Sequence, residues 1–570
     1  MTIRYLTTGV FLPAALLLMT QGCFDPELGP GGGYRCQGDQ ECPPGQQCTL
    51  QVGGARVCAA AGSQDLGLDG LAKDLKGGLD KGTVPDKGTV PDKGQTPDKG
   101  QTPDKGKVPD KGQTPDKGKV PDKGQTPDKA TSVCGNTKLE PGEQCEGTNL
   151  GGKTCATLPG KGYTGGSLSC KTTTCYFDTS RCYGLIPAAP VLVSTLHSSS
   201  LAEPAMAWDP NKSAGLIAWS DRHSASVSTP DLLVQSMDIT PKTSLGYLGG
   251  NLTKDAKNQQ RAPAAASMGK EPLLVFTDNQ YGYAYVSAMR VDLNGKVANY
   301  DVGGVPVNKP SVPMYTPAVA CADKSQNCLV VWADARKGSS YPAIYGAFLT
   351  LNKGYLVPGA AFQIGLGTYT HSDPSVATDG VNYLVAWHYR TSTNYNFIQT
   401  RSVTAKGAVG IATSQLSPTT TSTTDRPRLA YTGNNYLVVW EDRRTSGYDV
   451  YGARLSSAGA VFSSDNSKGF VIEGNSYHQL NPDLACHKQV CLVTYTEGSS
   501  SSTSTTVKAK RITMSSTTYS ILESGITVSA GSNTAAFPAV AYDPAGTFIL
   551  VWRDATATGV SRFLGRVFKL

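Results

Sequence analysis

Residues 427–455 read PRLAYTGNNYLVVWEDRRTSGYDVYGARL, and this arrangement returns seven times between residue 186 and the end of the 570-residue chain. In each repeat a proline opens a short apolar segment, an aromatic residue closes a second apolar run, and a third segment follows a polar loop. The aromatic residues recur every 53 to 57 residues. The prolines are Pro204, Pro263, Pro317, Pro374, Pro427, Pro482 and Pro538, and the aromatic residues are Trp219, Phe276, Trp332, Trp387, Trp440, Tyr495 and Trp552.

The second apolar run, LVVW at 437–440, is continuous rather than alternating, which predicts a strand that is covered on both faces. A repeat of about 55 residues with four short strands is typical of one blade of a β-propeller, where neighbouring blades cover each other's faces. We therefore predict an all-β fold in which residues 186–570 form a seven-bladed β-propeller. A linear solenoid built from the same repeats is the alternative.

The two ends of the repeat region complement each other. The seventh repeat stops after its third strand, at residues 562–570, and so lacks a fourth. A spare β-branched segment, PVLVST at 190–195, precedes the first repeat, where the outer strand of a preceding blade would lie. This segment can complete the seventh blade and close the ring, which would hide two sheet edges that otherwise favour aggregation.

The chain has 15 cysteines, and setting Cys23 aside leaves an even number, which suits disulfides in an oxidising compartment. Cys321 with Cys328, and Cys486 with Cys491, straddle the turn between the first two strands of a blade, where a disulfide can join them. No C-x2-C pair occurs, so we predict no metal site and no cofactor. The others form a group of four, Cys36, Cys42, Cys48 and Cys58, and a group of six, Cys134, Cys145, Cys155, Cys170, Cys175 and Cys182, whose connectivities stay open.

The first 22 residues carry Arg4 and then the apolar stretch GVFLPAALLLM, which is typical of an export signal. Gly22 followed by Cys23 resembles the lipobox of bacterial lipoproteins, a family in which the peptidase cuts before the cysteine and its sulfur carries diacylglycerol. The resemblance implies lipidation of Cys23, with residues 23–35 as a tether, and simple secretion with an unpaired cysteine is the alternative. Phe24 stands where an aspartate would retain such a protein in the inner membrane, so the outer membrane or cell surface is favoured.

Three segments separate the signal from the repeats. Residues 36–58 are too short for an apolar core, which predicts a small disulfide-rich module. Residues 61–130 contain the recurring hexapeptide P-D-K-G-x-[VT], whose prolines and charges predict a disordered stalk. Residues 134–182, with C-G-N-x-x-x-E-P-G-E-x-C and F-D-T-S-x-C, resemble cysteine-rich repeats of exported proteins from myxobacteria and related bacteria. The whole arrangement resembles the cell-surface lipoproteins of myxobacteria.

A match to a phosphate-binding motif and a net positive charge could indicate binding of nucleotides or nucleic acid, but their context argues against both. Residues 147–154, GTNLGGKT, match the phosphate-binding pattern G-x4-G-K-[ST], but a working loop needs a buried strand before it and a helix after it. Cysteines flank this segment and no apolar run precedes it, so we predict no nucleotide site. The net charge of +7 is spread along the chain without a basic stripe, which argues against nucleic-acid binding.

An acid stands two residues after the repeat aromatic in six of the seven repeats. This regularity favours a structural role, in which the carboxylate accepts hydrogen bonds from loop amides. A regular set of arginines, each fourteen residues after the aromatic, is interpreted in the same way. Repeat four departs from the pattern with His388, Tyr389 and Arg390, which are the first candidates for a binding group. The acids are Asp221, Asp278, Asp334, Asp442, Glu497 and Asp554, and the arginines are Arg290, Arg401, Arg454 and Arg566.

The sequence contains no H-E-x-x-H pair, no G-x-S-x-G elbow and no S-x-D-x-G-x-T-W turn of sialidase-like hydrolases. We therefore predict a binding or interaction protein without catalytic residues, which displays a monomeric propeller on a stalk and captures a protein or a glycan. The alternative is a propeller-fold hydrolase or lyase that acts on extracellular polysaccharide through two carboxylates on neighbouring loops.

Overall fold

The computed structural model describes residues 46–50, 56–60 and 134–570, apart from gaps in the last range. The predicted signal peptide (1–22), Cys23, the tether (23–35), Cys36, Cys42 and the stalk (61–130) lie outside the described residues. The gaps are 197–202, 210–213, 223–229, 239–248, 252–258, 281, 309–312, 323–326, 337, 339, 366–368, 394, 412–413, 420–423, 446, 466, 500–504 and 530–533.

Contacts divide the chain into two units, Met1–Asp122 and Lys123–Leu570. In the first unit, β1 (Gln46–Leu50) and β2 (Arg56–Ala60) pair as an antiparallel hairpin. Their register places the backbone of Cys48 opposite that of Cys58. This pairing is compatible with the small cross-linked module that the four cysteines predict.

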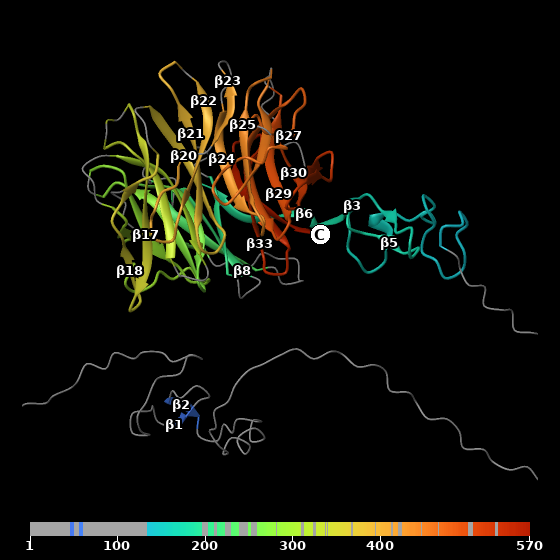
Figure 1. The fold of residues 1–570 in the computed structure, drawn as a ribbon, viewed down its shortest axis with the longest axis horizontal. Helices are drawn as coiled ribbons and strands as arrows, with labels where there is room; N and C mark the ends of the chain where they lie inside the picture. Colours follow the sequence, from blue (N-terminus) through green and yellow to red (C-terminus); the bar gives the residue numbers. More distant parts are fainter. Residues whose placement is uncertain are drawn as a thin grey trace, which may run out of the picture. The chain divides into compact units, whose positions relative to one another are not determined.

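The second unit contains seven antiparallel sheets, each of four or five strands, arranged as the blades of a β-propeller (Figure 1). In blades one to six the strand order follows the chain from the innermost strand outward, and in the seventh blade β6 from the N-terminal side is the outer strand. Blade one consists of β7 (Ala205–Trp208), β8 (Ala214–Asp221), β9 (Asp231–Asp238) and β10 (Gly249–Asn251), blade two of β11 (Gln260–Met268), β12 (Glu271–Asp278), β13 (Tyr285–Arg290) and β14 (Val305–Pro306), and blade three of β15 (Met314–Ala322), β16 (Asn327–Asp334), β17 (Ala343–Asn352), β18 (Tyr355–Pro358) and β19 (Phe362–Gln363). Blade four consists of β20 (Thr370–Thr378), β21 (Tyr383–Arg390), β22 (Asn396–Val403) and β23 (Ser414–Thr419), and blade five of β24 (Thr424–Tyr431), β25 (Tyr436–Asp442), β26 (Asp449–Leu455) and β27 (Phe470–Glu473). Blade six consists of β28 (His478–His487), β29 (Val490–Gly498), β30 (Thr505–Met514), β31 (Tyr519–Ile521) and β32 (Ile526–Thr527), and blade seven of β33 (Thr534–Tyr542), β34 (Phe548–Ala555), β35 (Ser561–Lys569) and β6 (Cys182–Leu196).

The apolar core is divided into seven clusters, one between each pair of neighbouring blades. The continuous apolar second strands supply both faces of these clusters, as expected for a strand buried on each side. The repeat aromatics are central to them, and Trp332, Trp387, Trp440 and Trp552 have no exposed surface. One cluster joins Trp208 and Trp219 of the first blade to Val551 and Phe563 of the last. Contact between the first and last blades is a property of a closed ring, so the solenoid alternative is wrong.

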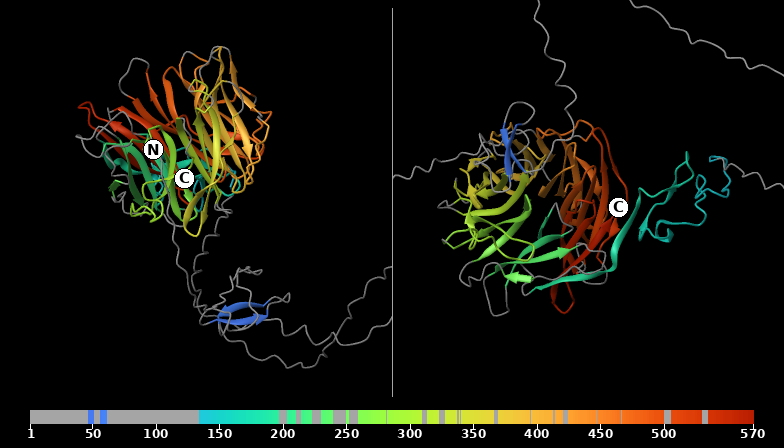
Figure 2. Two further views of the ribbon diagram at one scale, coloured as in Figure 1. Left: turned by 90° about the vertical axis from the view of Figure 1, so that its left-hand side faces the viewer. Right: turned by 90° about the horizontal axis from the view of Figure 1, so that it is seen from below.

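Ring closure follows the sequence prediction. The spare segment is part of β6, which pairs antiparallel with β35, so that Val191 lies opposite Gly565 and Leu192 opposite Leu564. Val193 is buried against the first and last blades. In Figure 2 the teal strand β6 lies beside the red C-terminal strand. The N-terminal side of the repeat region therefore supplies the outer strand of the seventh blade, and this prediction is confirmed.

The cysteine-rich module before the propeller is held by three disulfides, Cys134–Cys175, Cys145–Cys170 and Cys155–Cys182. Its regular elements are short: η2 (Cys155–Thr157), β3 (Gly165–Gly166), β4 (Ser169–Cys170) and β5 (Phe177–Asp178). The only helix after the GTNLGGKT segment in this described module is the three-residue η2, so the segment lacks the long helix that a phosphate-binding loop requires.

Cys182 is also the first residue of β6, so one strand belongs both to the module and to the last blade. Arg511 of β30 strengthens this connection, because its guanidinium donates to the backbone oxygens of Arg181 (2.8 Å) and Cys182 (3.2 Å). Arg511 is 1% exposed and pairs with Glu523. The closing strand is thus fixed to the sixth blade at the point where it leaves the module.

Two further disulfides lie in the propeller, where Cys321 is bonded to Cys328 and Cys486 to Cys491. Each pair is directly opposite in the hairpin between the first two strands of its blade. The five disulfides of the described residues indicate an extracellular or otherwise oxidising location. Across the same residues, no helix has the length and apolarity needed to span a bilayer.

Candidate functional site

Pro204 directly precedes β7, as the sequence suggested, but the other six repeat prolines do not open their strands and stand inside them at a β-bulge. In blades two to seven the register of the innermost strand shifts across the proline and the residue before it. The residue before each proline has a positive φ of 44–53°, a conformation that non-glycine residues seldom adopt. These residues are Ala262, Thr316, Asp373, Arg426, Asn481 and Phe537. A bulge redirects a side chain, and here it does so at the same place in six blades.

The bulges surround a central cavity of about 410 Å³, which all seven innermost strands line. Each blade contributes the residue before its proline, and every blade except the fifth also contributes the proline itself; the first blade contributes Glu203 with Pro204. The lining residues come from the middle of the innermost strands, as in β20, where 373–376 line the cavity.

The cavity is chemically asymmetric although its backbone is repetitive. Proline is constant in the seven repeats, whereas the residue before it differs each time. Blades two and three contribute the small side chains of Ala262 and Thr316, while blades four to six contribute Asp373, Arg426 and Asn481. The cavity wall therefore combines a repeated backbone position with side chains that differ in charge and size.

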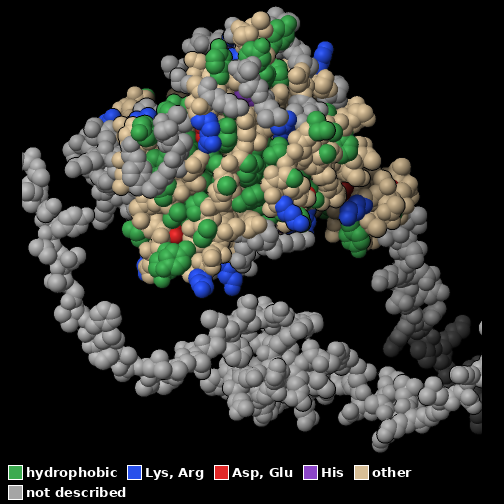
Figure 3. Space-filling model, turned by 60° about the vertical axis from the view of Figure 1, so that its left-hand side comes forward, with side chains coloured by type: hydrophobic (Ala, Val, Ile, Leu, Met, Phe, Trp, Pro, Cys, Tyr) green, Lys and Arg blue, Asp and Glu red, His purple; other side chains and the backbone are tan. Residues whose placement is uncertain are grey.

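Two arginines organise the charged side of the cavity. Arg426 Nη1 lies 3.1 Å from Glu203 Oε1 of the first blade, and its Nε lies 3.8 Å from Glu441 Oε1. Arg428 Nε lies 3.8 Å from Asp483 Oδ1. The Arg426–Glu203 pair thus joins the fifth blade to the first across the cavity, whereas the Arg428–Asp483 pair joins the neighbouring fifth and sixth blades. On the face shown in Figure 3, in contrast, Lys and Arg side chains are scattered singly.

Of the carboxyl groups beside the arginines, Glu441 is buried, and Asp373 and Asp483 are partly buried. Burial raises the pKa of Asp483, although its carboxylate accepts a hydrogen bond of 2.8 Å from the Val540 amide. Burial also raises the pKa of Asp373, and the nearby charge of Asp425 adds to this effect. These environments favour a cation or a hydrogen-bond donor beside each carboxylate.

Glu441 gives a testable pH dependence. Burial raises its pKa from the usual 4.5 to about 7, even though the Asn481 amide donates to Oε1 at 2.6 Å. Because the pKa is higher in the folded state, this group contributes most to stability below pH 4.5, and the contribution is lost as the pH rises through 7. We expect the wild type to lose about 3 kcal/mol relative to Glu441→Gln between pH 4 and pH 8. Urea unfolding of both proteins across this range measures the difference, and parallel stability curves would contradict the assignment.

The repeated acids after the aromatics have the structural role predicted from their regularity. Asp334 accepts a hydrogen bond from the Trp332 indole (2.9 Å) and another from the Arg336 amide (2.9 Å). Asp442 makes the same two contacts with Trp440 and Arg444. The remaining acids bind loop amides or basic side chains, namely Asp221 with Arg222, Asp278 with Gln280, Glu497 with Lys508 and Asp554 with Arg562. None of them lines the cavity.

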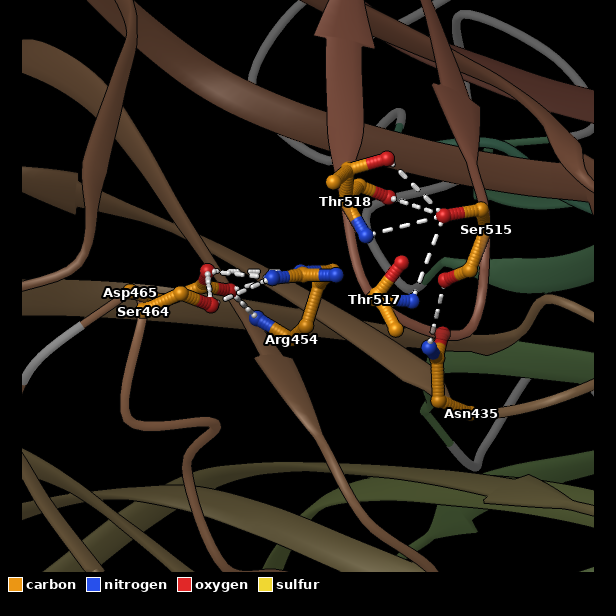
Figure 4. Close-up of polar contacts among 7 residues, drawn as sticks. All are labelled: Asn435, Arg454, Ser464, Asp465, Ser515, Thr517 and Thr518. Atoms are coloured by element: carbon orange, nitrogen blue, oxygen red, sulfur yellow. Dashed lines mark hydrogen bonds and ion pairs between the residues drawn. The ribbon is translucent and has the colours of Figure 1, made fainter.

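The repeated arginines also belong to the scaffold. Arg401 and Arg566 donate to backbone oxygens of the preceding blade, at Ile364 and Val528. Arg290 and Arg454 each bind an aspartate eleven residues later in the same blade, Asp301 or Asp465. Figure 4 shows Arg454 directed at Asp465 and Ser464, with the turn around Ser515 of the next blade nearby, where the Asn435 side chain donates to the Ser515 oxygen (3.2 Å).

Only one of the three candidates in repeat four approaches the cavity wall. Tyr389 is buried against His371 and Phe397, and Arg390 is exposed at the end of β21. His388 instead forms a cluster with Asp373 and Asp425. Sequence reasoning missed the residues that precede the repeat prolines. The signal was present as side-chain variation at a fixed position beside a constant proline.

No family model matches the chain, and no curated protein matches its sequence. Solved structures with a similar fold include a protein of unknown function from Dyadobacter fermentans, with 10% identity and a TM-score of 0.41 over 68% of this chain and 99% of that one. An α-L-arabinanase from Penicillium chrysogenum (11% identity, TM-score 0.36, 67% and 98% covered) and an α-L-arabinofuranosidase from Fusarium graminearum (10%, 0.35, 67% and 98%) are further examples. At these identities the likeness concerns the fold alone.

Proposed function

We propose that this chain is a membrane-anchored, extracytoplasmic binding protein whose propeller takes a glycan in its central cavity. The observation that carries the proposal is the ring of variable residues before the seven prolines. A volume of about 410 Å³ lies within the usual size of small-ligand sites, roughly 300–1,000 Å³. Carboxylates, guanidinium groups, an amide and a hydroxyl offer donors and acceptors in several directions, as the hydroxyl groups of a sugar require.

Exposed tyrosines support a glycan over a protein ligand. Tyr283, Tyr341 and Tyr395 lie in the loops between the second and third strands of blades two to four, with 46%, 50% and 37% of their surface exposed. The second strand ends at the edge where the innermost strand begins, since Asp278 lies opposite Gln260. The tyrosines therefore lie at the edge of the propeller where the innermost strands, whose middle parts line the cavity, begin. Tyrosine presents an apolar ring with a polar tip, which suits stacking on a sugar ring.

Attachment of the chain to the outer membrane or cell surface is part of the same proposal. Lipidation at Cys23 would hold the chain on the outer membrane or cell surface, and the proline-rich segment of 61–130 would place the propeller away from the bilayer. The disulfides support export. Membrane attachment itself rests on the resemblance of the N-terminal residues to a lipobox.

A hydrolase or lyase is the second candidate, and Glu441 is the observation that favours it. A carboxyl group with a pKa of about 7 can act as a general acid near neutral pH. However, Glu441 is paired with Arg426 and does not line the cavity. The cavity carboxylates Glu203 and Asp483 also face arginines, an arrangement that suits binding better than proton transfer.

Binding of the mature chain to a panel of extracellular polysaccharides and their oligosaccharides tests the proposal. We expect at least one glycan to bind, and Arg426→Gln to weaken that binding by about tenfold or more through loss of charge-assisted hydrogen bonds. Lys270→Ala, in the exposed turn between β11 and β12 at the other edge, is the matched control and should bind normally. Absence of glycan binding would overturn the proposal, whereas release of reducing ends that Glu441→Gln abolishes would establish the hydrolase.

A further inference from the structure

Asp373, His388 and Asp425 form a cluster in the wall of the cavity. Their ligand atoms all lie within 4.8 Å of one another, although they come from β20, β21 and β24 of two blades. Asp373 lines the cavity itself. The other group of potential ligands among the described residues contains Cys134 and Cys175, whose sulfurs are joined in a disulfide and are not available as thiolates.

The imidazole of His388 is oriented for coordination through Nδ1. Its Nε2 lies 2.9 Å from Asn396 Oδ1, an acceptor, so Nε2 carries the proton and Nδ1 keeps its lone pair. Nδ1 is 3.7 Å from Asp425 Oδ1 and accepts from the Ser372 hydroxyl at 3.1 Å. Histidine ligands in metal sites are held in this manner, with the second ring N–H donated to a neighbouring oxygen.

Two arginines lie near the cluster and act electrostatically on Asp373, but their ion pairs are with other carboxylates. Arg426 is paired with Glu203 and Glu441, and Arg428 with Asp483. The Asp373 carboxylate lies within 4.8 Å of that of Asp425, and the nearby charge of Asp425 raises its pKa. Two neighbouring carboxylates repel each other, and a divalent ion between them removes this repulsion.

The three side chains also break the repeat at one place. At the position after the repeat aromatic, where the fourth blade has His388, the other blades have serine, threonine, alanine, glutamate or arginine. Aspartate directly before the proline occurs only at Asp373, and aspartate two residues before it only at Asp425. Three donors that each occur once in seven repeats therefore meet at the junction of blades four and five.

We propose that Asp373, His388 and Asp425 bind one Zn²⁺ ion, with its remaining coordination position directed to the cavity. Two carboxylate oxygens and one imidazole nitrogen suit zinc, and three protein ligands with an open position are typical of an accessible zinc site. At zinc–ligand distances of about 2.0–2.2 Å, tetrahedral ligand atoms are about 3.4 Å apart, so small side-chain movements close the cluster. When the ion binds, it replaces the Ser372 hydroxyl as the partner of His388 Nδ1. This site is independent of the proposed glycan.

Titration of the metal-free, oxidised mature chain with Zn²⁺ alone, by calorimetry and equilibrium dialysis, tests the site. We expect one ion per chain, and at least tenfold weaker binding in both His388→Gln and Asp425→Asn. Asn396→Leu removes the acceptor of the His388 Nε2–H while leaving the three ligands in place, and should weaken binding by about tenfold to a hundredfold. His478→Gln, a histidine on β28 outside the cluster, is the matched control and should bind zinc as the wild type does.

Melting curves show whether each variant is folded, and Co²⁺ provides a second readout through its visible absorption on binding. Failure of the wild-type chain to bind zinc would overturn the proposed zinc site. Undiminished binding by folded His388→Gln would place the ion elsewhere and overturn it equally. Loss of zinc in the cluster variants with normal binding by His478→Gln would establish it.

Discussion

A chain that lacks residues 186–196 should melt about 10 °C or more below the wild type and should associate at micromolar concentrations. The deletion removes most of β6, which pairs with β35 over its length and buries Val193 between the first and last blades. It leaves β35 as an open edge, which favours pairing with other chains. Loss of several kcal/mol of packing free energy lowers the melting temperature by about this amount. Calorimetry and sedimentation measure the two effects.

Deletion of residues 61–130 is the control for this experiment. The repeated P-D-K-G sequence predicts a segment that buries no apolar surface, so its removal should leave the melting temperature of the propeller unchanged. If the chain without 186–196 melts like the wild type and stays monomeric, β6 does not close the ring.

Arg454→Met should lower the free energy of unfolding by about 3–5 kcal/mol. The Arg454 and Asp465 side chains are 1% and 0% exposed, and Nη2 lies 2.8 Å from Oδ1. The substitution leaves a buried carboxylate that has lost its ion pair, which costs far more than loss of an exposed pair. Urea unfolding monitored by tryptophan fluorescence measures the change.

Two further variants separate the ion pair from the packing. Arg454→Met combined with Asp465→Leu removes both charges and should recover much of the loss. Glu271→Gln breaks a pair of the same kind with Arg290, but its carboxylate is 48% exposed, so it should cost less than about 1 kcal/mol. If Arg454→Met, its combination with Asp465→Leu, and Glu271→Gln all lowered the free energy of unfolding equally, burial of an unpaired charge would not be the cause of the loss.

The architecture of the propeller could be predicted because it depends on features that repeat. Seven aromatic positions with one period, continuous apolar runs and a missing last strand define the blades and their closure without knowledge of any contact. The roles of Asp334 and Arg401 followed from the same regularity. Predictions for the N-terminal segment, including lipidation of Cys23, stay predictions.

The cavity could not be predicted because it depends on an exception to local preference. The residue before a proline normally adopts an extended conformation, yet Arg426 and Asn481 have positive φ, held there by the register of the neighbouring strand. The sequence indicates His388 because it departs from the repeat. Asp373 and Asp425 lie on other strands, and only packing of the fourth blade against the fifth brings the three side chains together.

The shared strand β6 also determines how the molecule bears mechanical load. Tension applied from the N-terminal side reaches the propeller through Cys182, after the Cys155–Cys182 disulfide has prevented the module from extending. At this point the Arg511 bonds to the backbone of Arg181 and Cys182 transfer force to the sixth blade. Gly184, paired with Lys569, is the next position to be loaded. Force from the N-terminal side is thus transferred to the sixth blade through Arg511 before it loads the pairing of β6 with β35, which closes the ring.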